Sequence, residues 1–249
     1  MARMLLNIAA YHFATVDAPD ALAASLQAAA EAGDVRGTIL VAPEGVNMFL
    51  AGNEPAVEAV LDVLRADARF DGLEVKRSWS RSQPFGRLKC KVKPEIITFR
   101  RDGTAPLDAR APAVDPPTLA RWIAQGHDDA GRRLVLLDTR NREEYGYGTF
   151  ENALTLPIDN FTDLPAALAP HREELADATV VSFCTGGIRC EKAAIWLQAD
   201  GMDNVLQLDG GILGYFERVG GFGFDGRCFV FDGRVALAPD LSPLIDDAA

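Results

Sequence analysis

Cys184 begins the segment of this sequence that is best suited to covalent chemistry. It follows an apolar run over residues 180–183, typical of a buried strand, and precedes a helical pattern over residues 189–199. Two glycines after it let the backbone curl so that its N–H groups converge on the sulfur, and the helix adds its positive end. Both effects favour the thiolate, which is the nucleophilic form of cysteine. We therefore predict a partly exposed catalytic Cys184 with Arg189 as a fixed charge, in a loop whose backbone groups come from Thr185, Gly186, Gly187 and Ile188.

The length of this loop separates two chemistries. Cysteine-based phosphatases have five residues between cysteine and arginine, which makes room for a phosphate, whereas four lie between Cys184 and Arg189. The loop is therefore better matched to a single sulfur atom or a small adduct. The alternative is a cysteine packed as a small apolar residue in a glycine turn, but the ordered strand, glycines, arginine and helix argue against it.

The elements around this loop predict a mainly parallel sheet. Apolar runs at 134–137, 153–156, 179–183 and 205–208 alternate with helical patterns. Short buried strands alternating with helices are typical of a parallel sheet with helices on both faces, and ligand chemistry collects at the carboxyl ends of its strands.

The first hundred residues have a different pattern, which reads strand, helix, strand, strand, helix, strand, with one extra strand. This order suits a ferredoxin-like, or acylphosphatase-like, open sheet. Residues 102–117 contain four prolines and lack hydrophobic periodicity. The predicted fold is thus α+β followed by α/β, with a first domain at 1–101, a linker at 102–117, a catalytic domain at 118–219 and a C-terminal extension at 220–249.

Charge is distributed unevenly along the chain. The protein has 25 Lys and Arg against 36 Asp and Glu, a net charge of −11, yet residues 76–101 hold nine cations and one acid. An acidic body argues against general attraction to nucleic acid or anionic membrane, while a local basic element orients a polyanion.

The basic element is predicted to bind RNA phosphates. Residues 87–93 alternate cation and apolar residue, so a strand there places its charges on one face and Leu88, Cys90 and Val92 on the other, against the helices. The alternative is a solvated edge strand whose lysines discourage aggregation. The predicted RNA-binding residues are Arg87, Lys89, Lys91 and Lys93, together with Lys76, Arg77 and Arg81.

Composition excludes several other classes of protein. No apolar run approaches the ~18 residues of a membrane-spanning helix, and residues 4–13 read as a first strand, not as a signal peptide. Four cysteines without a Cys-x-x-Cys pair, and three scattered histidines, predict neither a disulfide scaffold nor a metal site. We expect a cytoplasmic protein without membrane contact, and the oligomeric state is not readable.

The second half resembles the rhodanese domain. The resemblance rests on the active loop, on Leu137-Asp138-Thr-Arg140 with Glu144-Tyr145 and Gly148, and on Leu208-Asp-Gly-Gly211 after the last strand. It implies that Asp138 and Arg140 support the loop from beside it. Thr149 and Phe150 depart from the residues that many rhodaneses carry there.

Nearly the whole chain is similar to the tRNA uridine hydroxylase family. Seven ordered motifs carry the similarity, including Cys184-Thr-Gly-Gly-Ile-Arg-Cys-Glu-Lys192; they lie at residues 37–47, 83–89, 93–98, 138–141, 184–192, 210–213 and 228–232. The resemblance implies 5-hydroxylation of the wobble uridine of tRNA, with molecular oxygen as co-substrate and Cys184 essential. No cofactor is predicted from the sequence. The cysteine-rich tail of longer members is missing, so no metal site is carried over to Cys228.

Two other functions remain open from the residues. Cys184 can carry a persulfide, which makes a rhodanese-type sulfurtransferase the alternative enzyme, and a non-catalytic rhodanese-fold binding module is a third reading. For the hydroxylase, the thiolate of Cys184 can add to C6 of the pyrimidine, and a path through an oxidised Cys184 is equally open. Cys190 is either a resolving thiol or a packed residue, and packing is favoured; Lys192 is an RNA-contact candidate.

Overall fold

The computed structural model describes residues 4–246, which group by their contacts into two units. The first unit contains the chain up to Thr98, with 231–235 and the segment from Ser242 onward; the second contains Phe99–Val230 and Ala236–Leu241. The predicted linker at 102–117 therefore falls within the second unit, because residues 113–114 pair as a strand of its sheet. Within residues 220–246, 231–235 and 242–246 group with the first unit, and 220–230 and 236–241 group with the second.

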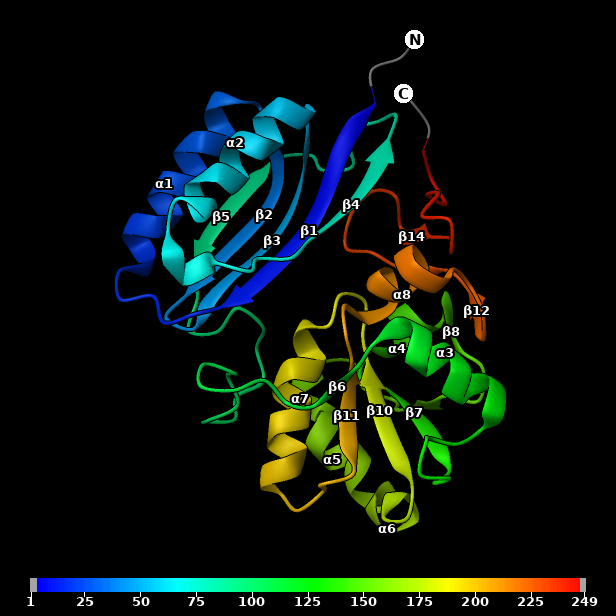
Figure 1. The fold of residues 1–249 in the computed structure, drawn as a ribbon. Helices are drawn as coiled ribbons and strands as arrows, with labels where there is room; N and C mark the ends of the chain where they lie inside the picture. The colour runs from blue at the N-terminus through cyan, green and yellow to red at the C-terminus, as the bar shows by residue number, and fades with distance from the viewer. Residues whose placement is uncertain (1–3, 247–249) are drawn as a thin grey trace. The chain divides into compact units, whose positions relative to one another are not determined.

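The first unit is an open sheet with two helices on one face (Figure 1). Its strand order is β4-β1-β3-β2-β5, in which β3 is antiparallel to both β1 and β2, and β5 is parallel to β2. This is the predicted ferredoxin-like arrangement with an extra edge strand, and it is confirmed. The strands are β1 (Leu5–Phe13), β2 (Arg36–Ala42), β3 (Gly45–Gly52), β4 (Val75–Ser80) and β5 (Leu88–Val92).

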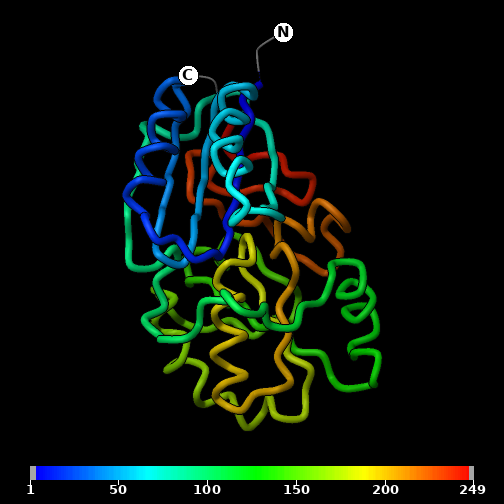
Figure 2. The backbone as a smooth tube through the Cα atoms, turned by 60° about the vertical axis from the view of Figure 1, so that its left-hand side comes forward, coloured from blue at the N-terminus to red at the C-terminus, as the bar shows by residue number. Residues whose placement is uncertain are grey.

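The helices α1 (Pro19–Ala32) and α2 (Glu54–Arg65) lie side by side on this sheet (Figures 1 and 2). Each begins with a proline in its first turn, where the missing N–H costs nothing. Each buries one apolar stripe at helical spacing, such as Val57, Val60, Leu61 and Leu64 of α2. These stripes form the core with alternate residues of the strands, which fixes one face of the sheet as covered.

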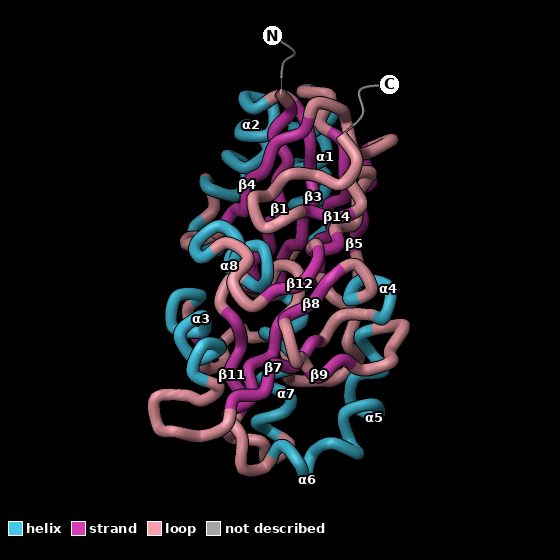
Figure 3. Tube along the Cα trace, turned by 90° about the vertical axis from the view of Figure 1, so that its right-hand side faces the viewer, coloured by secondary structure: helices cyan, strands magenta, loops and turns pink. Residues whose placement is uncertain are grey.

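The second unit contains a parallel sheet of order β6-β11-β10-β7-β9. Helices α3 and α8 lie on one side of it and α5 and α7 on the other (Figures 1 and 3), as predicted. The strands are β6 (Ala113–Val114), β7 (Leu134–Asp138), β9 (Leu154–Thr155), β10 (Thr179–Phe183) and β11 (Val205–Leu208). The helices are α3 (Pro116–Gln125), α4 (Arg142–Tyr145), α5 (Leu164–Leu168), α6 (Arg172–Leu175), α7 (Ile188–Ala199) and α8 (Gly211–Val219).

Strand pairing brings three connections to one edge of this sheet. β10 pairs with β7 on one side and with β11 on the other, all parallel, so their carboxyl ends meet. The residues that follow them start at Thr139, Cys184 and Asp209. The active loop is therefore flanked by the β7 and β11 connections.

Two small antiparallel pairs complete the second unit. β8 (Gly148–Phe150) pairs with β12 (Phe224–Gly226), and β13 (Cys228–Phe229) pairs with β14 (Ala236–Leu237). No helix within residues 4–246 is long and apolar enough to cross a membrane.

Candidate active site

The loop after β10 wraps its backbone around the sulfur of Cys184. Gly187 is the N-cap of α7 and has φ 104°, a left-handed conformation that favours glycine. In this conformation its N–H donates a hydrogen bond to Cys184 Sγ at 3.2 Å. The predicted curl of the two-glycine loop around the thiol is therefore present.

Cys184 is fully buried, whereas the sequence predicted a partly exposed thiol. The first turn of α8 packs directly on the loop and accounts for this. Ile212 N–H donates to the carbonyl of Cys184 at 2.9 Å, and Leu213 N–H donates to that of Thr185 at 3.0 Å. A Cβ on Gly211 would lie 2.6 Å from Cys184 O and from Gly187 N, so only glycine fits there. The free N–H groups that begin every helix thus hold this loop.

The surroundings of Cys184 favour its ionised form despite its burial. Burial alone would raise the pKa of the thiol. A hydrogen bond from Cys190, the charge of Arg189 and the N–H groups of Arg189 and Gly187 act in the opposite direction and bring the pKa of Cys184 well below its ordinary value. The net effect of these groups favours the thiolate of Cys184.

Arg189 is fixed by Glu144, a residue that the sequence analysis did not assign to the site. The guanidinium makes two short bonds to the carboxylate, at 2.5 and 2.6 Å, and both side chains are buried. Glu144 also accepts from the N–H of Asn141 at 3.1 Å and from the hydroxyl of Thr185 at 3.3 Å. Burial raises its pKa, but Arg189 outweighs this and the net shift is downward. The Asn141-x-x-Glu144 spacing of a helix cap was the only local signal for it.

Cys190 faces the active loop. Its thiol donates to the sulfur of Cys184, and its Sγ lies 3.6 Å from the hydroxyl oxygen of Thr139. Burial and the neighbouring thiolate raise the pKa of Cys190 well above its ordinary value, so it stays protonated. The residue is buried as a packed cysteine would be, and Thr139 and Cys184 are the neighbouring groups that act on its thiol.

Asp138 and Arg140 form a fully buried ion pair beside the loop. Nη2 of Arg140 lies 2.6 Å from the carboxylate and 2.7 Å from the carbonyl of Gly148. Thr149 donates to Asp138 at 2.8 Å, so the residue at the unusual rhodanese position completes this cluster. The pair braces the chain on both sides of α4, the helix that holds Glu144. Its supporting role in the reaction stays a prediction.

A second polar cluster contacts the first turn of α7 through Glu191. Arg110 donates to Glu191 at 2.8 Å and to Asp209 at 3.2 Å, and Gln207 donates to Glu191 at 2.9 Å. The segment expected to be a linker is thereby tied to the helix that begins at the active loop. Lys192, an RNA-contact candidate from the sequence, is buried with 1% exposure, so it does not lie on the surface.

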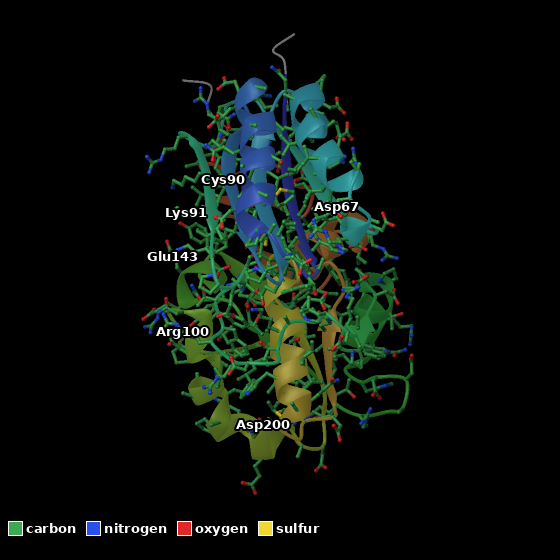
Figure 4. The ribbon with its side chains drawn as sticks, turned by 90° about the vertical axis from the view of Figure 1, so that its left-hand side faces the viewer. Asp67, Cys90, Lys91, Arg100, Glu143 and Asp200 are labelled. Atoms are coloured by element: carbon green, nitrogen blue, oxygen red, sulfur yellow. The ribbon has the colours of Figure 1, made fainter. Side chains whose placement is uncertain are left out.

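The structure divides the predicted basic surface between two edges of the first sheet. Leu88 and Cys90 pack on the core, and Cys90 lies beside α1 (Figure 4), so Lys89 and Lys91 project from the opposite face. Arg87 and Lys93 flank β5 and, like the two lysines, are exposed. Val92, predicted to pack, is 38% exposed near the end of the strand.

The other three predicted cations belong to the β4 edge, across the whole sheet from β5. Lys76 is buried, with its ammonium 5.8 Å from the centre of the Tyr11 ring. Arg77 is paired with Glu58 at 2.5 Å, and Arg81 follows the strand and is exposed. Lys76 and Arg77 therefore do not share the exposed face of Lys89 and Lys91, because β4 and β5 are opposite edges of the sheet. RNA binding by the predicted cations stays a prediction.

Comparison with known proteins covers both units of the chain. Residues 5–96 match the model of the UPF0176 acylphosphatase-like domain, and residues 118–218 match the rhodanese-like domain. A protein of Xanthomonas axonopodis pv. citri named tRNA uridine(34) hydroxylase is 64% identical over 98% of both chains, and one of Xanthomonas euvesicatoria with the same name is 63% identical over 98% of both. A third so named, from Xylella fastidiosa, is 59% identical over 98% of this chain and 95% of its own.

Identity of this extent, over nearly the whole of each chain, shows the family. The chain therefore belongs to the tRNA uridine(34) hydroxylase family.

Proposed function

We propose that this protein hydroxylates C5 of the wobble uridine of tRNA, with molecular oxygen as co-substrate and the thiolate of Cys184 as its nucleophile. The observation that carries the proposal is the match over 98% of both chains to relatives named tRNA uridine(34) hydroxylase. This match covers the first unit, which carries the exposed cations of β5, as well as the loop that contains Cys184. The ionised sulfur supports the same conclusion, because it provides the nucleophile that the chemistry needs.

The thiolate adds to C6 of the pyrimidine in this scheme. Addition at C6 places an electron pair at C5, which then reacts with oxygen before Cys184 leaves. The negative charge that develops on the ring is stabilised by the backbone N–H groups of the loop and by Arg189, which Glu144 holds in place. Because these donors are already oriented in the resting protein, little reorganisation is required when the charge forms.

The phosphates of tRNA bind, in this proposal, to the exposed cations of the β5 edge. Arg87, Lys89, Lys91 and Lys93 project from one face of a strand on a protein of net charge −11. Phosphate contacts fix the position and orientation of a nucleic acid without reading its sequence. We place the reaction in the cytoplasm, where tRNA is used.

The test is the nucleoside composition of tRNA from a deletion strain. We expect 5-hydroxyuridine to be lost from the wobble position and restored by the intact gene in air but not under nitrogen. A Cys184→Ala variant should fail to restore it, while a Cys90→Ala variant, changed in the other unit, should restore it in full. Unchanged 5-hydroxyuridine in the deletion strain would refute the proposal.

Sulfur transfer is the second candidate, supported by the rhodanese-like match at residues 118–218 and by a loop that fits one added sulfur. It predicts a persulfide on Cys184 and a loss of thiolated, not hydroxylated, nucleosides in the same strain. Full restoration by Cys184→Ala would instead leave the non-catalytic binding module as the surviving reading.

A further inference from the structure

Cys184 and Cys190 are both buried and lie on either side of Gly187, one in the active loop and one in the first turn of α7. The thiol of Cys190 donates to the thiolate of Cys184. The same residues bracket both: Gly187 donates its N–H to Cys184 Sγ at 3.2 Å and accepts from the N–H of Cys190 at 3.0 Å. Thr139 bonds to the carbonyl of Phe183 at 3.0 Å and lies 3.6 Å from the sulfur of Cys190. The contact is therefore built into the loop and the first turn of α7.

Hydroxylation by dioxygen has an electron balance that this pair fits. One oxygen atom enters the C5–H bond of uridine, and the other must be reduced to water. That reduction consumes two electrons and two protons beyond those of the substrate. Two thiols supply both when they become a disulfide.

We propose that Cys190 is a second catalytic residue and that the Cys184–Cys190 pair is the two-electron reductant of the hydroxylation. This inference rests on the proposed function. Uridine, dioxygen and two thiols become 5-hydroxyuridine, water and one disulfide, and every atom is accounted for.

The steps follow from the scheme above. Cys184 adds to C6, and dioxygen with a proton converts C5 to a hydroperoxide. The sulfur of Cys190 attacks the distal oxygen, which breaks the O–O bond, leaves a hydroxyl on C5 and converts Cys190 to a sulfenic acid. Loss of the C5 proton expels Cys184 from C6 and gives 5-hydroxyuridine. The released Cys184 thiolate then displaces hydroxide from the sulfur of Cys190, which forms the disulfide, and the hydroxide takes up the proton lost from C5 and leaves as water.

The environment of each sulfur suits its part in this sequence. Cys184 is the group that the loop donors and Arg189 hold ionised, ready to add to carbon. Cys190 is kept neutral by its burial and by the adjacent thiolate, so it remains a reductant that does not compete for the substrate. Because Gly187 bonds to both residues, the resolving step joins two groups of the same loop and helix start.

A single-turnover experiment tests the pair. Fully reduced protein, freed of added thiol, is mixed with excess unmodified tRNA in air, and 5-hydroxyuridine and disulfide are both measured by mass spectrometry. We expect about one 5-hydroxyuridine per protein and an equal amount of Cys184–Cys190 disulfide, with repeated turnover once dithiothreitol is added. Product formed while both thiols remain free would overturn the inference.

Substitution of Cys190 provides the matched comparison. Cys190→Ser keeps a hydrogen-bond donor beside Cys184 but cannot form a disulfide; without added thiol its yield should fall at least about tenfold. Cys90→Ala, in the first sheet, should match the unmodified protein. Retention of the full single-turnover yield by Cys190→Ser would refute the pair while leaving the hydroxylase intact. If the unmodified protein forms no 5-hydroxyuridine in tRNA under any condition, both the cysteine pair and the proposed hydroxylation are refuted.

Discussion

The central residue-scale feature is a thiolate that is stabilised without exposure to water. Cys184 depends on specific donors for its charge, and each donor is fixed by another group: Arg189 by Glu144, and Gly187 by its place at the start of α7. A cysteine in such a position reacts through its geometry as much as through its acidity.

The ionisation of Cys184 can be measured directly through the ultraviolet absorbance of its thiolate, which needs no reagent to reach the buried sulfur. Folding lowers the pKa of this thiol, so the thiolate forms at lower pH than in a free cysteine, and the absorbance that is missing from Cys184→Ala should rise with a midpoint below ~8.5. In Arg189→Ala the charge that favours the thiolate is missing, so the midpoint should move upward. A midpoint at or above that of free cysteine in the unmodified protein would contradict the assignment.

Glu144 should contribute to stability as well as to the site. In Glu144→Gln the buried guanidinium of Arg189 loses its counter-charge, which should reduce the free energy of unfolding by about 3 kcal/mol in urea titrations. Because folding lowers the pKa of Glu144, its contribution is present above the unfolded pKa and is lost as pH falls through the folded one. Glu143→Gln, one residue away and exposed (Figure 4), should change neither quantity. Equal effects of the two variants would contradict this role.

Residue types and spacing predicted the cysteine loop but not its supporting contacts. Cys184, the glycines and Arg189 lie in one short segment, so their proximity is local and readable. Glu144 lies forty-five residues before Arg189 and meets it only after β7 and β10 have paired. The sequence analysis placed Lys76 among the surface cations. Its burial depends on Tyr11 of the neighbouring strand, and strand pairing is not visible in the sequence.

At the scale of elements, the N-terminus of α8 is what shapes the active loop. Its first N–H groups bond to the loop carbonyls, and Gly211 allows the approach with φ +62°. The alternation of charged and apolar side chains along β5 could be predicted from the sequence, because successive side chains of a strand point to opposite faces. The order β4-β1-β3-β2-β5 could not, because nothing in the charge pattern says which strands become neighbours.

Gly211→Ala tests this contact between the N-terminus of α8 and the active loop. The new Cβ would lie 2.6 Å from Cys184 O and Gly187 N, so the loop must shift, and we expect at least about a tenfold loss of hydroxylation and a higher midpoint for the ionisation of Cys184. Gly201→Ala is the control, because Gly201 also has positive φ but open space around it. That control should lose about 1 kcal/mol of stability and no activity. Similar activity losses in both variants would show that backbone strain, not contact with the loop, is responsible.

At the scale of the whole molecule, a net charge of −11 contrasts with the exposed cations at β5, which are Arg87, Lys89, Lys91 and Lys93. The net charge of −11 repels a polyanion in general, so we expect the exposed cations of β5 to determine where one can approach. Binding of this kind depends on release of counterions from the phosphates and therefore on salt.

The salt dependence of tRNA binding measures how many phosphates the exposed cations of β5 contact. Replacing Lys89 and Lys91 by glutamine removes two phosphate contacts, which should weaken binding and reduce the slope of log affinity against log salt by up to about 2. The matched control changes Arg65 and Arg69, which carry the same charge but are paired with acids on and beside α2. Both variants lower the net charge equally, so a general electrostatic effect would alter their slopes alike. A larger slope change in the Lys89 and Lys91 variant alone would locate the phosphates at the β5 edge, whereas equal changes would remove the reason to place tRNA there.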